Sequence, residues 1–506
     1  MSDTATPPDL TALIRDALAL LDRDQPAAAE PLLQAALAAD PAQADALQLL
    51  GLVRRSQRLD TEAEDLYRRS LAANPKQPHV HHNLGNLLGL QRRYDEAIAA
   101  QREAIRQKPT YLEAMLALGQ AQQDARDLAG AEKTFRTMLH IQPHLALAKQ
   151  CLASVLIEQE RPKEAETILR QAITQGVSNP RQMAALTHNL GIALKKQQRH
   201  DEALAQFDAA KSLVPDMPLV DYNRAATLQQ LKRNDAALEA YRAALVRNPA
   251  DIMAHREFNQ LLYRMDRPDE FLRSYDEAMI ALPQFASLPL GKADLLYRQG
   301  RFAEAHENFS RAVMLAPESV TAQEGLGLAL LSLGEIEAAR RQHEKALAME
   351  PENIGVRINT VATLLRAGDP ERARDVAGEG IAREPANQTI LAMWGLTLRA
   401  LGDPREAELN DYEKYVQVFE LDPPGGFSDM ESFNHELNAY LDSLHTDKRE
   451  FLDQTLRGGT QTLDNLFAAG HDPVNRLRMQ IDKAVGAYIA RMTADENHPL
   501  LKHKRA

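Results

Sequence analysis

The chain of 506 residues has a single cysteine, few aromatic residues and no long apolar run. One cysteine excludes an internal disulfide framework and a cysteine-based zinc cluster. Aromatic residues make up only 5% of the chain, fewer than a large β-protein would use to pack its sheets. No stretch reaches the roughly 18 apolar residues that a membrane-spanning helix needs. The opening MSDTATPPDL also lacks the apolar core of a signal peptide. We therefore expect a cytoplasmic protein that does not use a membrane.

Positively charged residues are outnumbered by negatively charged ones. Lysine and arginine number 59 against 71 aspartates and glutamates, which gives a formal net charge of −12. Binding to phosphate backbones requires a basic surface, so we do not expect a protein that binds nucleic acid in general. The acidic balance favours basic protein partners and disfavours anionic membranes.

What the chain does have is a repeat with a period of 34 residues. Prolines and small residues each recur at this step, and both series slip at one place, around TQGVSNPRQM (174–183). Several registers that slip together indicate one repeat with one insertion. The prolines are at positions 41, 75, 109 and 143, and then at 215, 249, 283, 317, 351 and 385.

Each repeat unit predicts two helices. Residues 78–91 carry apolar side chains at helical spacing, and residues 95–107 do so again after an acidic start. Pro109 ends the pair, because proline disfavours helix at the residue before it. Small residues at the helix crossing let two helices pack about 8–10 Å apart. The pattern therefore predicts an all-α array of helix hairpins.

The 34-residue step, the small residues and the closing proline resemble the tetratricopeptide repeat. The segment HHNLGNLLGLQRRYDEAIAAQREAIRQKP (81–109) is similar to its consensus. The resemblance implies a right-handed superhelical solenoid whose concave groove, lined by the first helix of each unit, holds a peptide or a partner helix. Counting from Ala29 to Ala407 gives twelve units. We assign residues 9–420 to this array, with the insertion at 174–183.

Three departures from the repeat predict local irregularity. Asn259 and Phe271 replace small residues, so we expect wider packing there. The insertion at 174–183 is expected to lengthen the turn after the fifth unit. Gly378 and Gly380 are weak helix formers, so the array is expected to loosen near 375–420.

Polar residues gather at the positions that face the groove in the repeat family. At four sites, asparagine stands two residues before the small residue of a first helix. A side-chain amide both donates and accepts hydrogen bonds, so it suits an extended peptide backbone. The alternative is that asparagine is simply frequent in this repeat, and both interpretations stay open. The candidate groove residues are Asn83, Asn86, His82, His188, Asn189, Tyr222, Asn223 and Asn359.

No metal site is predicted, although His79 and His82 can share a helix face. A transition-metal site needs a third ligand and supporting groups, which the surrounding sequence does not offer. Cys151 lies within a repeat helix without basic neighbours, so we interpret it as a packed or groove-facing thiol.

The repeat stops near residue 420. Residues 421–430 are rich in proline and glycine and predict a linker, and 431–444 and 474–492 predict amphipathic helices. FLDQTLRGGTQT (451–462) and the later DENHPLL resemble the start of the 2-oxoglutarate/Fe(II) oxygenase domain that follows repeat arrays in some bacterial proteins. We therefore assign 431–506 to a partial, mostly helical oxygenase-like segment. Its marker residues are Arg457, Gly458, Gly459, Thr460, Gln461 and Thr462.

The oxygenase resemblance implies hydroxylation of a substrate at an iron held by two histidines and one carboxylate. Only 86 residues follow residue 420, too few for the roughly eight strands of such a barrel besides two helices. His445 and Asp447 match part of the ligand pattern but precede the marker, where the family has no ligands. We therefore assign no catalytic residue. Fe(II) and 2-oxoglutarate enter only if a catalytic half follows Ala506.

Two functional hypotheses follow from the sequence. The first is a protein- or peptide-binding scaffold that uses its groove and does no chemistry. The second is the substrate-recruiting part of a 2-oxoglutarate/Fe(II) oxygenase whose catalytic half is absent from this chain.

Overall fold

The computed structural model describes residues 9–217, 219–444, 466–495, 498 and 501. Helices make up nearly all of the regular structure, and the described residues contain no strand. The chain divides into two compact units, Met1–Ala237 (unit 1) and Leu238–Ala506 (unit 2). The predicted all-α class is confirmed.

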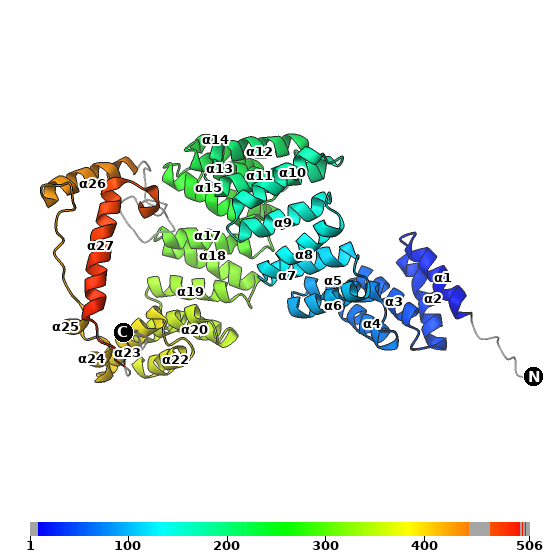
Figure 1. Ribbon diagram of the computed structural model, residues 1–506. Helices are drawn as coiled ribbons and strands as arrows, with labels where there is room; N and C mark the ends of the chain where they lie inside the picture. The colour runs from blue at the N-terminus through cyan, green and yellow to red at the C-terminus, as the bar shows by residue number, and fades with distance from the viewer. Residues whose placement is uncertain (1–8, 218, 445–465, 496–497, 499–500, 502–506) are drawn as a thin grey trace, which may run out of the picture. The chain divides into compact units, whose positions relative to one another are not determined.

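Helices of unit 1 form consecutive hairpins, each with a first and a second helix (Figure 1). The first helices are α1 (Leu10–Leu21), α3 (Ala44–Ser56), α5 (Pro78–Leu90), α7 (Leu112–Asp124), α9 (Ala146–Glu158), α11 (Pro180–Lys196) and α13 (Val220–Gln230). The second helices are α2 (Pro26–Ala39), α4 (Asp60–Ala73), α6 (Tyr94–Gln107), α8 (Leu128–Ile141), α10 (Pro162–Gln175) and α12 (His200–Leu213). Helix α14 (Asn234–Arg247) follows α13 and continues into unit 2.

Unit 2 continues the hairpins and ends in a different segment. Its first helices are α15 (Ile252–Arg264), α17 (Ser287–Arg298), α19 (Val320–Ser332), α21 (Ile354–Arg366) and α23 (Gln388–Leu401). Its second helices are α16 (Arg273–Ala281), α18 (Phe302–Leu315), α20 (Ile336–Met349), α22 (Pro370–Arg383) and the short α24 (Arg405–Leu409). After them come α25 (Tyr412–Tyr415), α26 (Met430–Leu444), the 3-10 turn η1 (Leu466–Ala469) and α27 (Asp472–Arg491).

The turn inside every hairpin uses one residue in the left-handed conformation. These residues share a register, and together they mark the twelve hairpins predicted from Ala29 to Ala407. Non-glycine residues pay a steric cost in this conformation that glycine does not pay. The turn residues are Asp24, Arg58, Arg92, Arg126, Glu160, Gln198, Lys232 and Asp266, followed by Gly300, Gly334, Gly368 and Gly402.

Small residues stand where an aromatic ring of the second helix meets the first helix. A Cβ atom added at Gly119 would lie 2.4 Å from the Cζ atom of Phe135, and one at Gly51 would lie 2.6 Å from Tyr67. Phe135 and Tyr67 are fully buried. Because packed rings cannot yield that much space, a side chain at Gly51 or Gly119 would force the ring of the second helix to shift.

Arginines at the start of second helices connect consecutive hairpins of unit 1. The Nη1 atom of Arg93 donates to Glu64 of the preceding second helix at 2.7 Å, and its Nε atom donates to Glu96 at 2.8 Å. Burial raises the pKa of Glu64, but the hydrogen bonds from Arg93 and Arg68 outweigh it and leave this pKa below its usual range. Arg161 and Arg199 repeat the arrangement in later hairpins.

The insertion lengthens a helix and not the turn, contrary to our expectation. Helix α11 has 17 residues, whereas α5, α7 and α9 have 13 each. The connection from Gln175 to Pro180 is as short as the others, and Asn179 caps α11 by accepting from two backbone N–H groups. The four extra residues therefore add about one turn of helix.

The hairpin with Asn259 and Phe271 is irregular in a way that the sequence only partly predicted. Asn259 is fully buried, and its side-chain oxygen accepts from the backbone N–H of Leu272 at 2.5 Å. Leu272 adopts a left-handed conformation, so α16 begins late and has 9 residues where α18 has 14. Asn259 thus fixes the start of a shortened second helix.

Gly380 has a packing role that explains its presence within a helix. A Cβ atom there would lie 2.8 Å from the Cδ atom of Arg357, whose side chain is almost fully buried. Arg357 donates to the carbonyl oxygens of Val376 and Pro351 at 2.9 and 2.7 Å. The glycine makes room for an arginine that joins α21 to α22.

The C-terminal helices lie where the sequence predicted them. Phe433 and Leu437 of α26 pack against Val474 of α27. Asp472 is the first residue of α27 and not its cap, and its carboxylate accepts from Arg476 at 2.6 Å. The marker residues Arg457, Gly458, Gly459, Thr460, Gln461 and Thr462, with His445 and Asp447, lie outside the described residues.

Candidate binding face

Within unit 1 and within unit 2, several pairs of consecutive first helices contact one another, and we call the surface that the first helices present in each unit its first-helix face. In unit 1, α5 contacts α7, α9 contacts α11, and α11 contacts α13. In unit 2 the same holds along α15, α17, α19, α21 and α23. All eight groove candidates lie on these helices, and the two faces are described separately below.

Three side chains close a ring of hydrogen bonds on the face of unit 1. The Nδ1 atom of His82 lies 2.9 Å from the Oε1 atom of Gln101, and the Nε2 atom of Gln101 donates to the Oδ1 atom of Asn86 at 3.0 Å. The Nδ2 atom of Asn86 lies 3.1 Å from the Nε2 atom of His82. Because an amide nitrogen only donates, His82 carries its proton on Nδ1. The ring therefore holds all three side chains in fixed orientations.

A second polar contact joins α11 to α13. The Nδ2 atom of Asn223 donates to the Nε2 atom of His188 at 2.9 Å. Burial lowers the pKa of His188 to about 4, and a hydrogen bond with Asn189 opposes this only weakly. His188 is thus neutral at pH 7, which it must be to accept from the amide.

Unit 2 repeats this geometry with a different acceptor. The Nδ2 atom of Asn359 on α21 donates to the Oε1 atom of Glu324 on α19 at 3.0 Å. In both pairs the acceptor stands 35 residues before the asparagine. At two of the four sites of this register, asparagine therefore links consecutive first helices, a role that neither sequence interpretation included.

The remaining candidates are placed on the same face. Asn83 and Asn189 are half-buried on α5 and α11, and Tyr222 is half-buried beside Asn223 on α13. Cys151 is half-buried on α9, where burial raises the pKa of its thiol to about 11, as a packed thiol would show. Among the described residues, no three histidine, cysteine or acidic side chains gather as a metal site would require.

Sequence reasoning missed Gln101 and Glu324. Gln101 stands at the register where Tyr67 and Phe135 provide aromatic rings. A polar residue in this aromatic series could have indicated its role from the sequence. Glu324 precedes a groove position by one residue, and its pairing with Asn359 is visible only once neighbouring helices are placed.

The face of unit 2 contains a hollow of about 430 Å³. Helices α17, α19 and α21 supply most of its lining, which includes two carboxylates and a tyrosine ring. Burial raises the pKa of Glu324, whose hydrogen bond from Asn359 opposes the shift.

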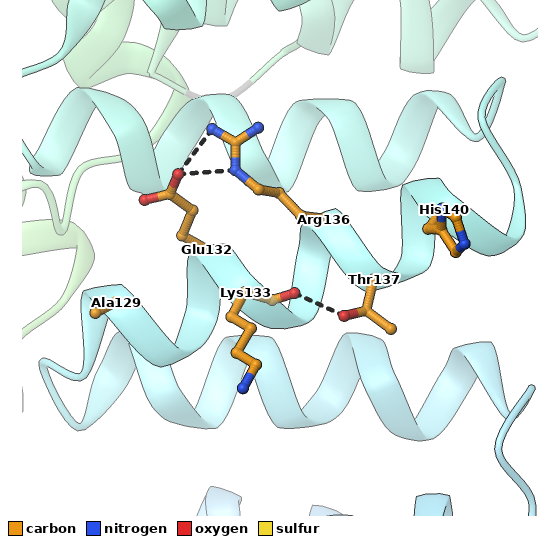
Figure 2. A pocket seen from close by; sticks show the side chains of 6 residues that line it. All are labelled: Ala129, Glu132, Lys133, Arg136, Thr137 and His140. Atoms are coloured by element: carbon orange, nitrogen blue, oxygen red, sulfur yellow. Dashed lines mark hydrogen bonds and ion pairs between the residues drawn. The ribbon is translucent and has the colours of Figure 1, made fainter.

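A second hollow lies along the surface of α8 (Figure 2), and it is a weaker candidate for a binding site. All six of its lining residues belong to that one helix. Glu132 is paired there with Arg136 at 2.7 Å, and it also accepts from Arg161. Burial raises the pKa of Glu132, but the hydrogen bonds from Arg136 and Arg161 outweigh it and leave this pKa below its usual range. These charges already satisfy one another.

Comparison with protein families identifies the chain. The tetratricopeptide repeat model matches residues 15–78, 82–146, 152–218, 188–252 and 290–354, which together cover more than half of the chain. The chain therefore belongs to the tetratricopeptide repeat family, as the sequence predicted. A comparison with curated proteins gave no match.

Several solved structures are similar to this chain at low identity. Naa15/Naa10 bound to HypK-THB shows 19% identity over 86% of this chain and 72% of that one, with a TM-score of 0.31. Yeast Tom70 shows 15% identity over 74% and 99%, with a TM-score of 0.34. The pilF protein of Pseudomonas aeruginosa shows 23% identity over 44% and 96%, with a TM-score of 0.36. At these TM-scores none of the three carries an argument about function.

The oxygenase resemblance gains no support from these comparisons. The family match is to the repeat alone, and the marker residues Arg457 to Thr462 lie outside the described part of the chain. None of the helices that the structure describes is long and apolar enough to cross a membrane.

Proposed function

We propose that the chain is a scaffold that binds a protein or peptide on its first-helix face. The observation that carries this proposal is the fixed orientation of asparagine side chains along that face. Asn223 and Asn359 each use their Nδ2 atom to bind the preceding first helix. Among the described residues neither Oδ1 atom accepts a hydrogen bond, so both are available to a backbone N–H of a partner.

Membership of the repeat family supports the same function, because such arrays are protein-interaction modules. Pre-oriented acceptors reduce the entropy that binding costs, since the side chains do not have to be ordered again. An extended peptide offers one N–H group per residue to such a row of acceptors.

Phage display of random peptides of about twelve residues against the full chain tests this proposal. We expect enriched peptides whose affinity falls about tenfold in the double variant Asn189→Ala/Asn223→Ala or in Asn359→Ala, because each removed hydrogen bond contributes about 0.5–1.5 kcal/mol. Fluorescence anisotropy with a labelled peptide gives the dissociation constants.

The matched control is Asn308→Ala on α18, whose amide donates to the backbone oxygen of Glu304 in its own helix. Circular dichroism melting of every variant separates lost binding from lost structure. Enriched peptides that bind all of these variants equally well would contradict the proposed face.

A further inference from the structure

The hollow on the first-helix face of unit 2 has a chemistry that specifies its occupant. Its walls carry the carboxylates of Asp294 and Glu324, the ring of Tyr297 and the amide of Asn359. Leu290 and Leu328 add apolar surface. All of these residues belong to α17, α19 and α21 of unit 2.

Two glycines create the depth of this hollow. Gly291 and Gly325 stand at the register that asparagine occupies in α11 and α13. A Cβ atom at Gly325 would lie 2.2 Å from the Cε1 atom of Phe309, and one at Gly291 would lie 2.9 Å from the hydroxyl of Tyr275. The floor is therefore formed by glycine backbone with aromatic rings directly beneath it.

The two carboxylates of the hollow differ in whether a cation is paired with them. The carboxylate of Glu324 accepts from the neutral amide of Asn359, and the nearby Glu350 adds further negative charge. Asp294 is paired with Arg298 of its own helix at 2.9 Å, and Lys292 is paired with Asp276 at 2.5 Å. Glu324 is half-buried, and among the described residues no ion pair to its carboxylate is found.

We infer that this hollow receives the side chain of a lysine or arginine from the bound peptide. The cationic head pairs with Glu324 and lies against the ring of Tyr297, and the methylene stem contacts Leu290 and Leu328. The inference rests on the proposed function, because it names the residue class that a peptide on this face must supply. It also agrees with the net charge of −12 of the chain, which favours basic partners.

The experiment is a double-mutant cycle on the full chain. Peptides enriched by phage display are labelled with fluorescein, and the basic residue of each is replaced by methionine. Both forms are titrated against the wild-type chain and against Glu324→Gln, which keeps an oxygen for Asn359. We expect the methionine peptide to bind the wild-type chain about tenfold more weakly, since a hydrogen bond to a charged group contributes about 1.5–3 kcal/mol. With Glu324→Gln the two peptides should bind alike.

Two further variants complete the design. Glu337→Gln on the exposed surface of α20 removes the same charge away from the hollow, so it should retain the tenfold preference. Thr321→Trp places a large ring at an exposed position on the rim and should reduce binding of the basic peptide without affecting folding.

The outcomes separate this inference from the proposed function. Enriched peptides that lack a basic residue, or a preference for the basic residue that survives Glu324→Gln, overturn the inference but leave peptide binding intact. Failure to enrich any peptide on the wild-type chain overturns both. Loss of the preference in Glu337→Gln as well would show that overall charge acts, and not this hollow.

Discussion

Helices α11 and α13 of unit 1 differ from α17 and α19 of unit 2 in what occupies the same register of a first helix. In unit 1, Asn189 and Asn223 stand there, and the structure ties Asn223 to His188. In unit 2, Gly291 and Gly325 stand there, and the face opens into a hollow above aromatic rings. One repeat therefore makes two kinds of surface by exchanging asparagine for glycine at a single position.

The turns inside the hairpins also differ between the units, because glycine is again more frequent in unit 2. Unit 1 places charged or polar residues such as Arg58, Arg92 and Arg126 in the left-handed turn position, at φ of 60–64°. Unit 2 uses Gly300, Gly334 and later glycines at the equivalent turns, after Asp266. Unit 1 thus carries backbone strain that most turns of unit 2 avoid.

The largest effect is expected from filling the floor of the hollow. Gly325→Ala should destabilise unit 2 by about 3 kcal/mol, because the added Cβ meets a buried phenylalanine ring. Gly89→Ala is the matched control in unit 1, since a Cβ there meets nothing within 4 Å and should stabilise α5 by about 0.5–1 kcal/mol. Guanidinium unfolding followed by circular dichroism measures both, and equal shifts would refute the steric account of the floor.

The next effect concerns the buried arginine of unit 2. Arg357→Met should cost about 2–3 kcal/mol, because the carbonyl oxygens of Val376 and Pro351 lose their buried donors. Arg366→Met on the same helix changes an exposed side chain and should be nearly neutral. Thermal melting distinguishes the two variants, and a stabilised Arg357→Met variant would show that burying this charge costs more than its contacts return.

A third prediction concerns His188 on the first-helix face of unit 1, which should make the free energy of unfolding depend on pH. Its folded pKa of about 4 lies below the unfolded value, so the unfolded state binds protons first as pH falls below about 6.5. Unit 1 should therefore lose about 2 kcal/mol between pH 7.5 and 5 through this residue alone.

His188→Gln keeps an acceptor for Asn223 but does not titrate, so its unfolding free energy should fall less over this range. His144→Gln changes an exposed histidine and is the matched control. An unchanged slope in His188→Gln would mean that His188 is not held neutral in the folded chain.

The smallest effect tests the turns. Arg92→Gly should stabilise unit 1 by about 0.5–1 kcal/mol, because glycine adopts the left-handed conformation without steric cost. The reciprocal change, Gly334→Arg, should destabilise unit 2 by a similar amount. Melting temperatures that move in the same direction for both variants would show that the turns are not what distinguishes the units.

The period of the sequence predicted the hairpins because the small residues and prolines that define the repeat are read directly from their spacing. It did not predict the length of α11, since an insertion of four residues can extend a helix or a turn equally well. The left-handed turn series was missed in unit 1, because Arg58, Glu160 and Lys232 carry none of the glycine signal that marks such turns.

The sequence predicted which positions lie on the first helices, but it did not predict which side chains bind one another there. Asn223 and Asn359 were identified by register, but their donation to His188 and Glu324 depends on how consecutive helices are spaced. The hollow of unit 2 was missed because glycine at a groove position suggests no side-chain chemistry. Its acidic wall comes from a neighbouring register.

Hydrogen exchange of the full chain, with and without an enriched basic peptide, tests the central claim most directly. Backbone amides that bury a bound segment exchange more slowly, and mass spectrometry of peptic fragments locates them. We predict slower exchange in α17, α19 and α21 when the peptide is bound, and unchanged exchange in α18 and α20. Protection confined to the second helices, or to none of these helices while the peptide is bound, would contradict the assignment of the first-helix face as the binding surface.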